Sequence, residues 1–165
     1  MSGTIVMGIG NPLGGDDAVG ALVANTLNQA LGTLGDGRYS AKGRMPTGIT
    51  AIDTSAVPEN YTSVVRRYHP DLLILVDAAD MGLPAGAVRI VPAERIKALS
   101  FSTHHMPLSA FISYVKEFCG KVLLVGIQPK QTETGAPISQ SVRKGARKLA
   151  RTILEGRLCE IRPLE

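Results

Sequence analysis

Apolar positions along the chain follow two patterns, which alternate from one end to the other. Residues 72–76 and 122–127 are apolar throughout, which is typical of strands covered on both faces. Residues 18–31 instead repeat apolar side chains at helical spacing, and Gly32 ends that pattern. The segments that we expect to form strands are 4–7, 49–52, 72–76, 87–91 and 122–127. The segments that we expect to form helices are 18–31, 58–68, 107–115 and 139–155, with irregular structure at 33–47 and 92–106.

Strands that alternate with helices predict an α/β fold. We expect a three-layer α/β/α arrangement around an open, mostly parallel twisted sheet of about five strands. The turn at 82–86 is too short for a parallel crossover, so the strand at 87–91 is expected to be antiparallel and at an edge. Residues 1–156 are expected to form a single domain, followed by a C-terminal tail at 157–165.

The composition is that of a globular protein, with 44% hydrophobic and 19% charged residues. No apolar run is long enough for a membrane span, and Met1-Ser2-Gly3 passes directly into the first expected strand. We therefore expect a cytoplasmic protein with no membrane insertion. Cys119 and Cys159 lack paired spacing, which fits reduced thiols.

The net charge of +4 comes largely from one helix. Its basic side chains lie opposite its apolar stripe and are Arg143, Lys144, Arg147, Lys148 and Arg151. A solvated helix face explains this pattern most simply, and it is also compatible with an acidic partner protein. An aromatic content of 4% leaves few groups for base stacking, so we expect no nucleic-acid partner.

The richest motif is G-I-G-N-P-L-G-G-D-D-A-V-G at residues 8–20, between the first strand and the first helix. A dinucleotide site is one interpretation, but the spacing is G-x-G-x-x-x-G and Pro12 offers no N–H to a phosphate. Asp16 and Asp17 would also repel a pyrophosphate. The ordinary alternative is a capped helix. We assign Asp16 to that cap, which leaves Asp17 available to a cation.

Polar residues follow the ends of the expected parallel strands, where such sheets bind their ligands. These residues are Asp17, Asp53, Asp77 and Gln128, and His104 lies in a loop before a later helix. Two carboxylates and an imidazole suit a divalent ion such as Ni²⁺, Zn²⁺ or Fe²⁺. Structural roles are the alternative for each, and Asp53 in particular can orient a backbone N–H. The residues alone indicate a metal-binding α/β protein, with hydrolase as one candidate class.

The chain carries four motifs in this order: the segment at residues 8–20, L-L-I-L-V-D-A-A-D-M-G-L, S-T-H-H-M-P-L and L-L-V-G-I-Q-P. Together they resemble the [NiFe]-hydrogenase maturation endopeptidases. The resemblance runs from about residue 4 to about residue 155 and is strongest to the type that processes the large subunit of hydrogenase 3. It implies a protease that removes the C-terminal extension of the large-subunit precursor after nickel insertion. It also implies metal-binding and catalytic roles for Asp17, Asp77 and His104, and thus an aspartyl, metal-binding hydrolase.

The Ni²⁺ implied by this resemblance is expected to arrive with the precursor, which is the expected partner. The chain departs from the family pattern in two places. Thr54-Ser55 replaces a common Gly-Gly, and His105 stands where the most similar type usually has another polar residue. The sequence therefore leaves open which of His104 and His105 is the metal ligand. A non-proteolytic, nickel-sensing chaperone of the same precursor is the alternative function, and a nucleotide-binding enzyme is a third class. The oligomeric state is left open by the sequence.

Overall fold

A computed structural model describes residues 3–32, 48–103 and 106–165. Its strands are β1 (Thr4–Ile9), β2 (Ile49–Ser55), β3 (Leu72–Ala78), β4 (Val88–Ile90) and β5 (Lys121–Ile127). Its helices are α1 (Val19–Ala30), α2 (Thr62–Tyr68), α3 (Leu108–Val115) and α4 (Gln140–Leu154). Short 3₁₀ helices occur at η1 (Gly15–Ala18), η3 (Pro58–Tyr61), η4 (Ala93–Ala98) and η5 (Leu158–Glu160).

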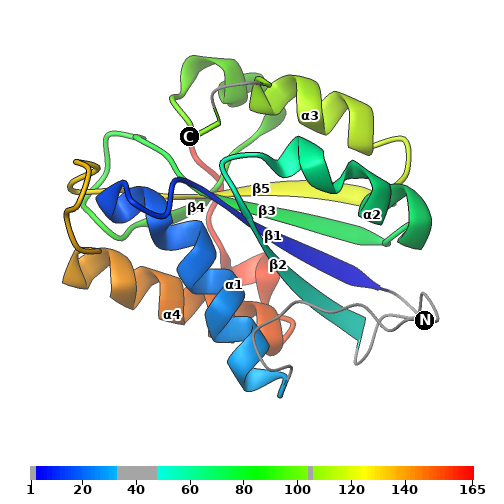
Figure 1. The fold of residues 1–165 in the computed structure, drawn as a ribbon, viewed down its shortest axis with the longest axis horizontal. Helices are drawn as coiled ribbons and strands as arrows, with labels where there is room; N and C mark the ends of the chain where they lie inside the picture. The colour runs from blue at the N-terminus through cyan, green and yellow to red at the C-terminus, as the bar shows by residue number, and fades with distance from the viewer. Residues whose placement is uncertain (1–2, 33–47, 104–105) are drawn as a thin grey trace.

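The five strands form one sheet in the order β2-β1-β3-β5-β4. The first three neighbouring pairs are parallel, and β4 pairs with β5 in the antiparallel sense. Helices α1 and α4 cover one face, and α2 and α3 cover the other (Figure 1). The predicted three-layer arrangement with one antiparallel edge strand is therefore confirmed.

Side chains of the central strands alternate between two apolar clusters, as a pleated sheet requires. Ile74 and Val76 of β3 pack toward α1 and α4, whereas Leu73 and Leu75 pack toward α2 and α3. Because both faces of β3 are covered, its sequence is apolar without interruption until Asp77. That carboxyl group is consequently an exception that needs a physical explanation.

Three segments differ from or add to the sequence expectations. Residues 92–106 were expected to be irregular, yet η4 occupies 93–98 with Ile96 buried. The helix expected at 58–68 is η3 followed directly by α2. The tail at 157–165 returns to the sheet, where Pro163 forms a parallel bridge with Ile90 of β4.

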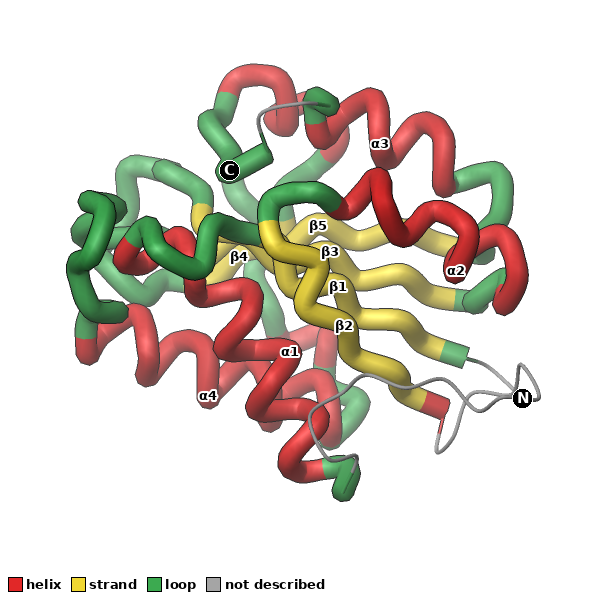
Figure 2. Tube along the Cα trace, viewed as in Figure 1, coloured by secondary structure: helices red, strands yellow, loops and turns green. Residues whose placement is uncertain are grey.

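Figure 2 shows how the loops gather at the carboxyl ends of the parallel strands, at the opposite end of the sheet from the start of β1. Within the described residues, no helix is both long and apolar enough to cross a membrane. The expected loop at 33–47 lies outside the described residues.

Candidate functional site

The strand order reverses between β1 and β3, because β2 is added on one side of β1 and β3 is added on the other. Helix α1, which follows β1, covers one face, and α2, which precedes β3, covers the opposite face. In open α/β sheets, ligands bind at such a switch point, in the crevice beyond the carboxyl ends of the strands. Asp17 follows β1 and Asp77 lies at the end of β3, so both lie at this switch point.

Glycines bring the start of α1 close enough to the sheet to hold Asp17 there. A Cβ atom on Gly20 would lie 2.3 Å from the Ile9 carbonyl oxygen and 2.8 Å from that of Val76. A Cβ on Gly10 would lie 1.8 Å from the carbonyl oxygen of Asp17. Only residues without a side chain permit these approaches, so the glycine spacing of the motif serves backbone packing.

Asp77 is completely buried, and Ser102 holds its carboxylate through two hydrogen bonds. The Ser102 hydroxyl donates to Oδ1 at 2.6 Å, and the Ser102 backbone N–H donates to Oδ2 at 3.1 Å. Burial and, to a smaller extent, the negative charge of Asp17 raise the pKa of Asp77 to about 7, while hydrogen bonds from Ser102 and from the Ala78 backbone oppose the shift. Asp17 is thus near enough for its charge to act on Asp77.

Asp16 does not cap the first helix, so that assignment is wrong. Helix α1 begins after Ala18, and no side chain caps it or η1. The buried Asp16 carboxylate instead accepts hydrogen bonds from the N–H groups of Lys130, Gln131 and Ser139 and from the Ser139 hydroxyl. Asp16 therefore fixes the loop between β5 and α4 beside the crevice.

The other polar residues at the strand ends serve the protein itself. Asp53 is exposed, and its Oδ1 accepts the Ser55 backbone N–H at 2.9 Å, which is the local role that the sequence left open for it. Gln128 is buried, and its Oε1 accepts the N–H groups of Met81 and Leu83. Both residues hold the loops at the strand ends in place. Asp17 and Asp77, called the acidic pair below, are then the polar side chains left for chemistry among the described candidates.

Ser102 is the residue of this site that sequence reasoning missed. It lies in the S-T-H-H motif, two positions before His104. A single serine in a loop does not indicate, from the sequence, that it will donate a hydrogen bond to Asp77 in β3. His104 and His105 themselves lie outside the described residues. Among the residues that are described, no group of three metal-ligating side chains gathers, so the three-residue metal site stays a prediction.

A cysteine nucleophile is disfavoured by the geometry. Cys119 is half-buried, and burial raises the pKa of its thiol to about 11. A thiol of this kind is protonated at neutral pH and is a poor nucleophile. Cys159 is exposed in the tail, away from the strand ends that form the crevice. The acidic pair remains the reactive feature of the described residues.

The topology and the paired carboxylates define a doubly wound α/β protein with an acidic site at its switch point. A sequence profile of hydrogenase maturation proteases, HycI, matches residues 38–156. The chain belongs to the hydrogenase maturation protease family and is a peptidase by that membership. Its glycine-rich turn with Asp17 precedes the segment that the profile matches.

Individual relatives extend the similarity over the first strand and turn. The hydrogenase 3 maturation protease of Escherichia coli K12 is 33% identical over 140 residues, which cover 84% of this chain and 81% of the relative. The solution structure of the endopeptidase HycI from Escherichia coli aligns with a TM-score of 0.80 at 29% identity, covering 100% of this chain and 97% of the other. HycI from Thermococcus kodakarensis aligns with a TM-score of 0.76 at 30% identity, covering 94% and 92%.

Proposed function

We propose that this peptidase removes the C-terminal extension of a [NiFe]-hydrogenase large-subunit precursor after nickel insertion, and that it recognises the nickel carried by that precursor. Asp17, Asp77 and His104 are the proposed ligands. The observation that carries the proposal is the burial of Asp77 at the end of β3, beside Asp17 and held by Ser102. A carboxyl group in this position disfavours folding, so a role in the site accounts for its presence.

The donor set fits a nickel ion that is part of the substrate. Carboxylate oxygens and an imidazole nitrogen are ligands that borderline divalent ions accept. Three such side chains from one side leave coordination positions for the ligands that the precursor itself supplies. The metal would then position the scissile bond, and the chain would need no resident ion.

Different environments favour different roles for the two carboxylates. Asp77 is buried and has both oxygens hydrogen-bonded by Ser102, so its position is fixed, as an anchor requires. Asp17 is only half-buried. We assign to Asp17 the additional role of general base that takes a proton from the attacking water.

The central experiment incubates the purified chain with nickel-loaded and with nickel-free precursor and measures the mass of the precursor's C-terminal end. We expect shortening of the nickel-loaded precursor alone. Asp77→Asn should lower the cleavage rate by about a hundredfold or more, because it weakens the anchor for the metal. Asp53→Asn removes an exposed carboxylate with a local role and is the matched control, expected to cleave at the normal rate.

Two results would contradict parts of this proposal. Cleavage by Asp77→Asn at the wild-type rate would show that this carboxylate does not contact the metal. Binding of the nickel-loaded precursor by the wild-type chain, with the C-terminal extension left intact, would identify a nickel-sensing chaperone instead. Separate His104→Ala and His105→Ala variants then assign the imidazole, since the true ligand is the one whose loss abolishes cleavage.

A further inference from the structure

A basic cavity of about 800 Å³ lies between helix α4, strand β4 and the C-terminal tail, and the proposed function does not use it. Seven cationic side chains line it. Arg157 is paired with acids, and the other six come from all three elements. They are Arg89 of β4, Lys144, Arg147, Lys148 and Arg151 of α4, and Arg162 of the tail. One helix face thus supplies only part of the positive charge.

Close backbone packing brings these elements together. Gly86, just before β4, contacts α4 so tightly that a Cβ on it would lie 2.2 Å from the Ser141 carbonyl oxygen. In return, a Cβ on Gly145 of α4 would lie 2.4 Å from the Gly86 carbonyl oxygen. Because the two backbones touch, the basic face of α4 stands beside Arg89 and forms a concave surface with it.

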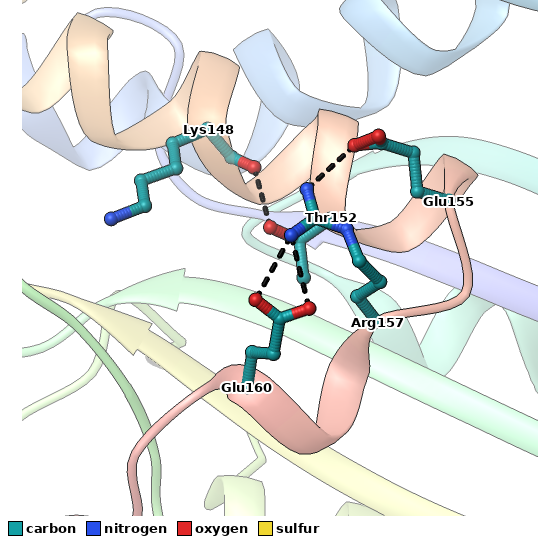
Figure 3. Close-up of polar contacts among 5 residues, drawn as sticks. All are labelled: Lys148, Thr152, Glu155, Arg157 and Glu160. Atoms are coloured by element: carbon teal, nitrogen blue, oxygen red, sulfur yellow. Dashed lines mark hydrogen bonds and ion pairs between the residues drawn. The ribbon is translucent and has the colours of Figure 1, made fainter.

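The tail completes the cavity through a fixed turn. Figure 3 shows Arg157 between two acids, with its guanidinium donating to Glu155 at 2.6 Å and to both oxygens of Glu160 at 2.9 and 3.0 Å. Thr152 donates to the Lys148 carbonyl at 2.9 Å within α4, just before this turn. The Lys148 ammonium group points away from these acids (Figure 3).

The acidic residues at the cavity are therefore already occupied. Among the described residues that line it, Glu160 is the only acid, and its carboxylate is paired with Arg157. Within the described parts of the chain, no ion pair reaches any of the six cavity cations. Their mutual repulsion lowers helix stability, since like charges three and four residues apart disfavour a helix. A bound anion would relieve that repulsion.

The character of the lining favours an acidic protein segment over other anions. No aromatic side chain lines the cavity in the described structure, so a nucleic acid would find no base-stacking surface. The α4 cations are exposed at the ends of long side chains, which suits several carboxylates spread along a peptide. A compact small-molecule site would present fixed, buried polar groups, but the Thr152 hydroxyl is already bonded within α4.

We propose that this cavity is an exosite that binds an acidic segment of the protein substrate while the crevice engages the scissile region; this rests on the proposed function. Helix α4 connects the two sites, because Asp16 binds Ser139 directly before the helix begins. Lys144 lies about 8 Å along the helix axis from Ser139, and Arg151 lies about 18 Å away. An extended segment of about six residues covers that distance.

The test compares the wild-type chain with the double variant Lys144→Glu/Lys148→Glu in cleavage of nickel-loaded precursor at several salt concentrations. The introduced acids pair with Arg147 and Arg151 at helical spacing, so the fold is retained. We expect KM to rise by about tenfold at low salt with kcat unchanged, because the loss is one of electrostatic attraction. The difference should vanish toward 1 M salt, where the screening length is about 3 Å.

A matched control is Lys116→Glu/Lys121→Glu, which changes the net charge equally at exposed positions that do not line the cavity. It should keep the wild-type KM. An equal rise in KM for both double variants would overturn the exosite, since overall charge would then explain the effect. An unchanged KM for Lys144→Glu/Lys148→Glu would overturn it as well.

A binding measurement separates failure of the exosite from failure of the proposed function. The full chain is titrated with a fluorescent glutamate-rich peptide, which needs neither nickel nor cleavage, and Asp77→Asn serves as an inactive version. We expect binding to the wild type and to Asp77→Asn, and loss of binding by Lys144→Glu/Lys148→Glu. Absence of peptide binding, or tighter binding of a single-stranded RNA with the same number of charges, would overturn the proposal.

Discussion

Two buried aspartates in this molecule carry opposite pKa shifts because they differ in their hydrogen-bond donors. Burial raises the pKa of Asp16, but four hydrogen bonds from the loop between β5 and α4 outweigh it and bring the pKa below the usual value. At Asp77 burial dominates and the negative charge of Asp17 adds to it, so the pKa rises to about 7 despite the hydrogen bonds from Ser102 and the Ala78 backbone. Asp16 is accordingly a charged structural group, whereas Asp77 titrates near neutrality in the candidate site.

The Asp77 carboxyl group should make the protein less stable as the pH rises. Between about pH 4 and pH 7 the native state keeps a proton that the unfolded chain has released, so the free energy of unfolding falls over this range by up to roughly 4 kcal/mol. Asp77→Asn removes the titration while keeping the shape of the side chain. We expect the variant to be more stable than the wild type at pH 8, with the difference closing by pH 4, as measured by urea unfolding.

Asp53→Asn is the control for this measurement, because it makes the same chemical change at an exposed position. Parallel pH profiles for the wild type and Asp77→Asn would show that the buried carboxyl is not the group that titrates. Together with the cleavage assay, the expected result would describe a residue that lowers stability and supports activity.

At the residue scale, the sequence correctly placed Asp17 and Asp77 after strand ends, but the helix-capping role expected for Asp16 is wrong. Asp17 and Asp77 follow strand ends, and parallel topology brings strand ends together. Asp16 binds backbone groups more than a hundred positions later in the chain. Neither that contact nor the contact of Ser102 with Asp77 leaves a local pattern, since each depends on how two loops meet in the folded chain.

At the scale of elements, the position of α1 depends on Gly20. A Cβ there would lie 2.3 Å and 2.5 Å from the Ile9 carbonyl oxygen and amide nitrogen, and these backbone atoms cannot rotate away. Gly20→Ala should therefore lower the free energy of unfolding by roughly 2 kcal/mol or more, despite the better helix propensity of alanine. Cleavage should also fall, because a displaced α1 moves Asp17 away from Asp77. Urea unfolding and the precursor assay measure the two effects.

Gly156→Ala is the matched control for Gly20→Ala. Gly156 ends α4 with φ +69° and has open space around its missing side chain, so alanine there should cost only about 1–2 kcal/mol of backbone strain. Cleavage by this control should be normal. If Gly20→Ala were as stable and as active as the wild type, the close approach of α1 would be of no consequence for the site.

Elements with a clear pattern of apolar residues could be predicted from the sequence. Elements that bury only one or two side chains could not. Strands β3 and β5 are marked by unbroken apolar runs, and the short turn at 82–86 identified β4 as antiparallel. The 3₁₀ helix η4 was missed because it buries only Ile96, which is too little to produce a repeat. Its formation depends on packing against the cluster between the sheet and α3.

At the scale of the whole molecule, the tail belongs to the packed structure. The Leu164 side chain is 7% exposed, and its N–H donates to the Ile90 carbonyl at 2.8 Å. Leu164→Ala should therefore lower the free energy of unfolding by about 2 kcal/mol or more. Leu154→Ala is the control, because this leucine is 38% exposed and should change stability little. Thermal unfolding of the two variants checks the difference, and equal midpoints would show that the tail contributes nothing.

The pairing of the tail with β4 has a consequence for how copies of this protein meet. Ile90 uses its N–H on the Arg162 carbonyl and its own carbonyl on the Leu164 N–H, so these outward-facing backbone groups have partners within the same chain. Unpaired strand edges are templates on which other chains aggregate. Residues 162–164 thus shield this border of the sheet, and a chain that lacks them would present a hydrogen-bonding surface to its neighbours in concentrated solution.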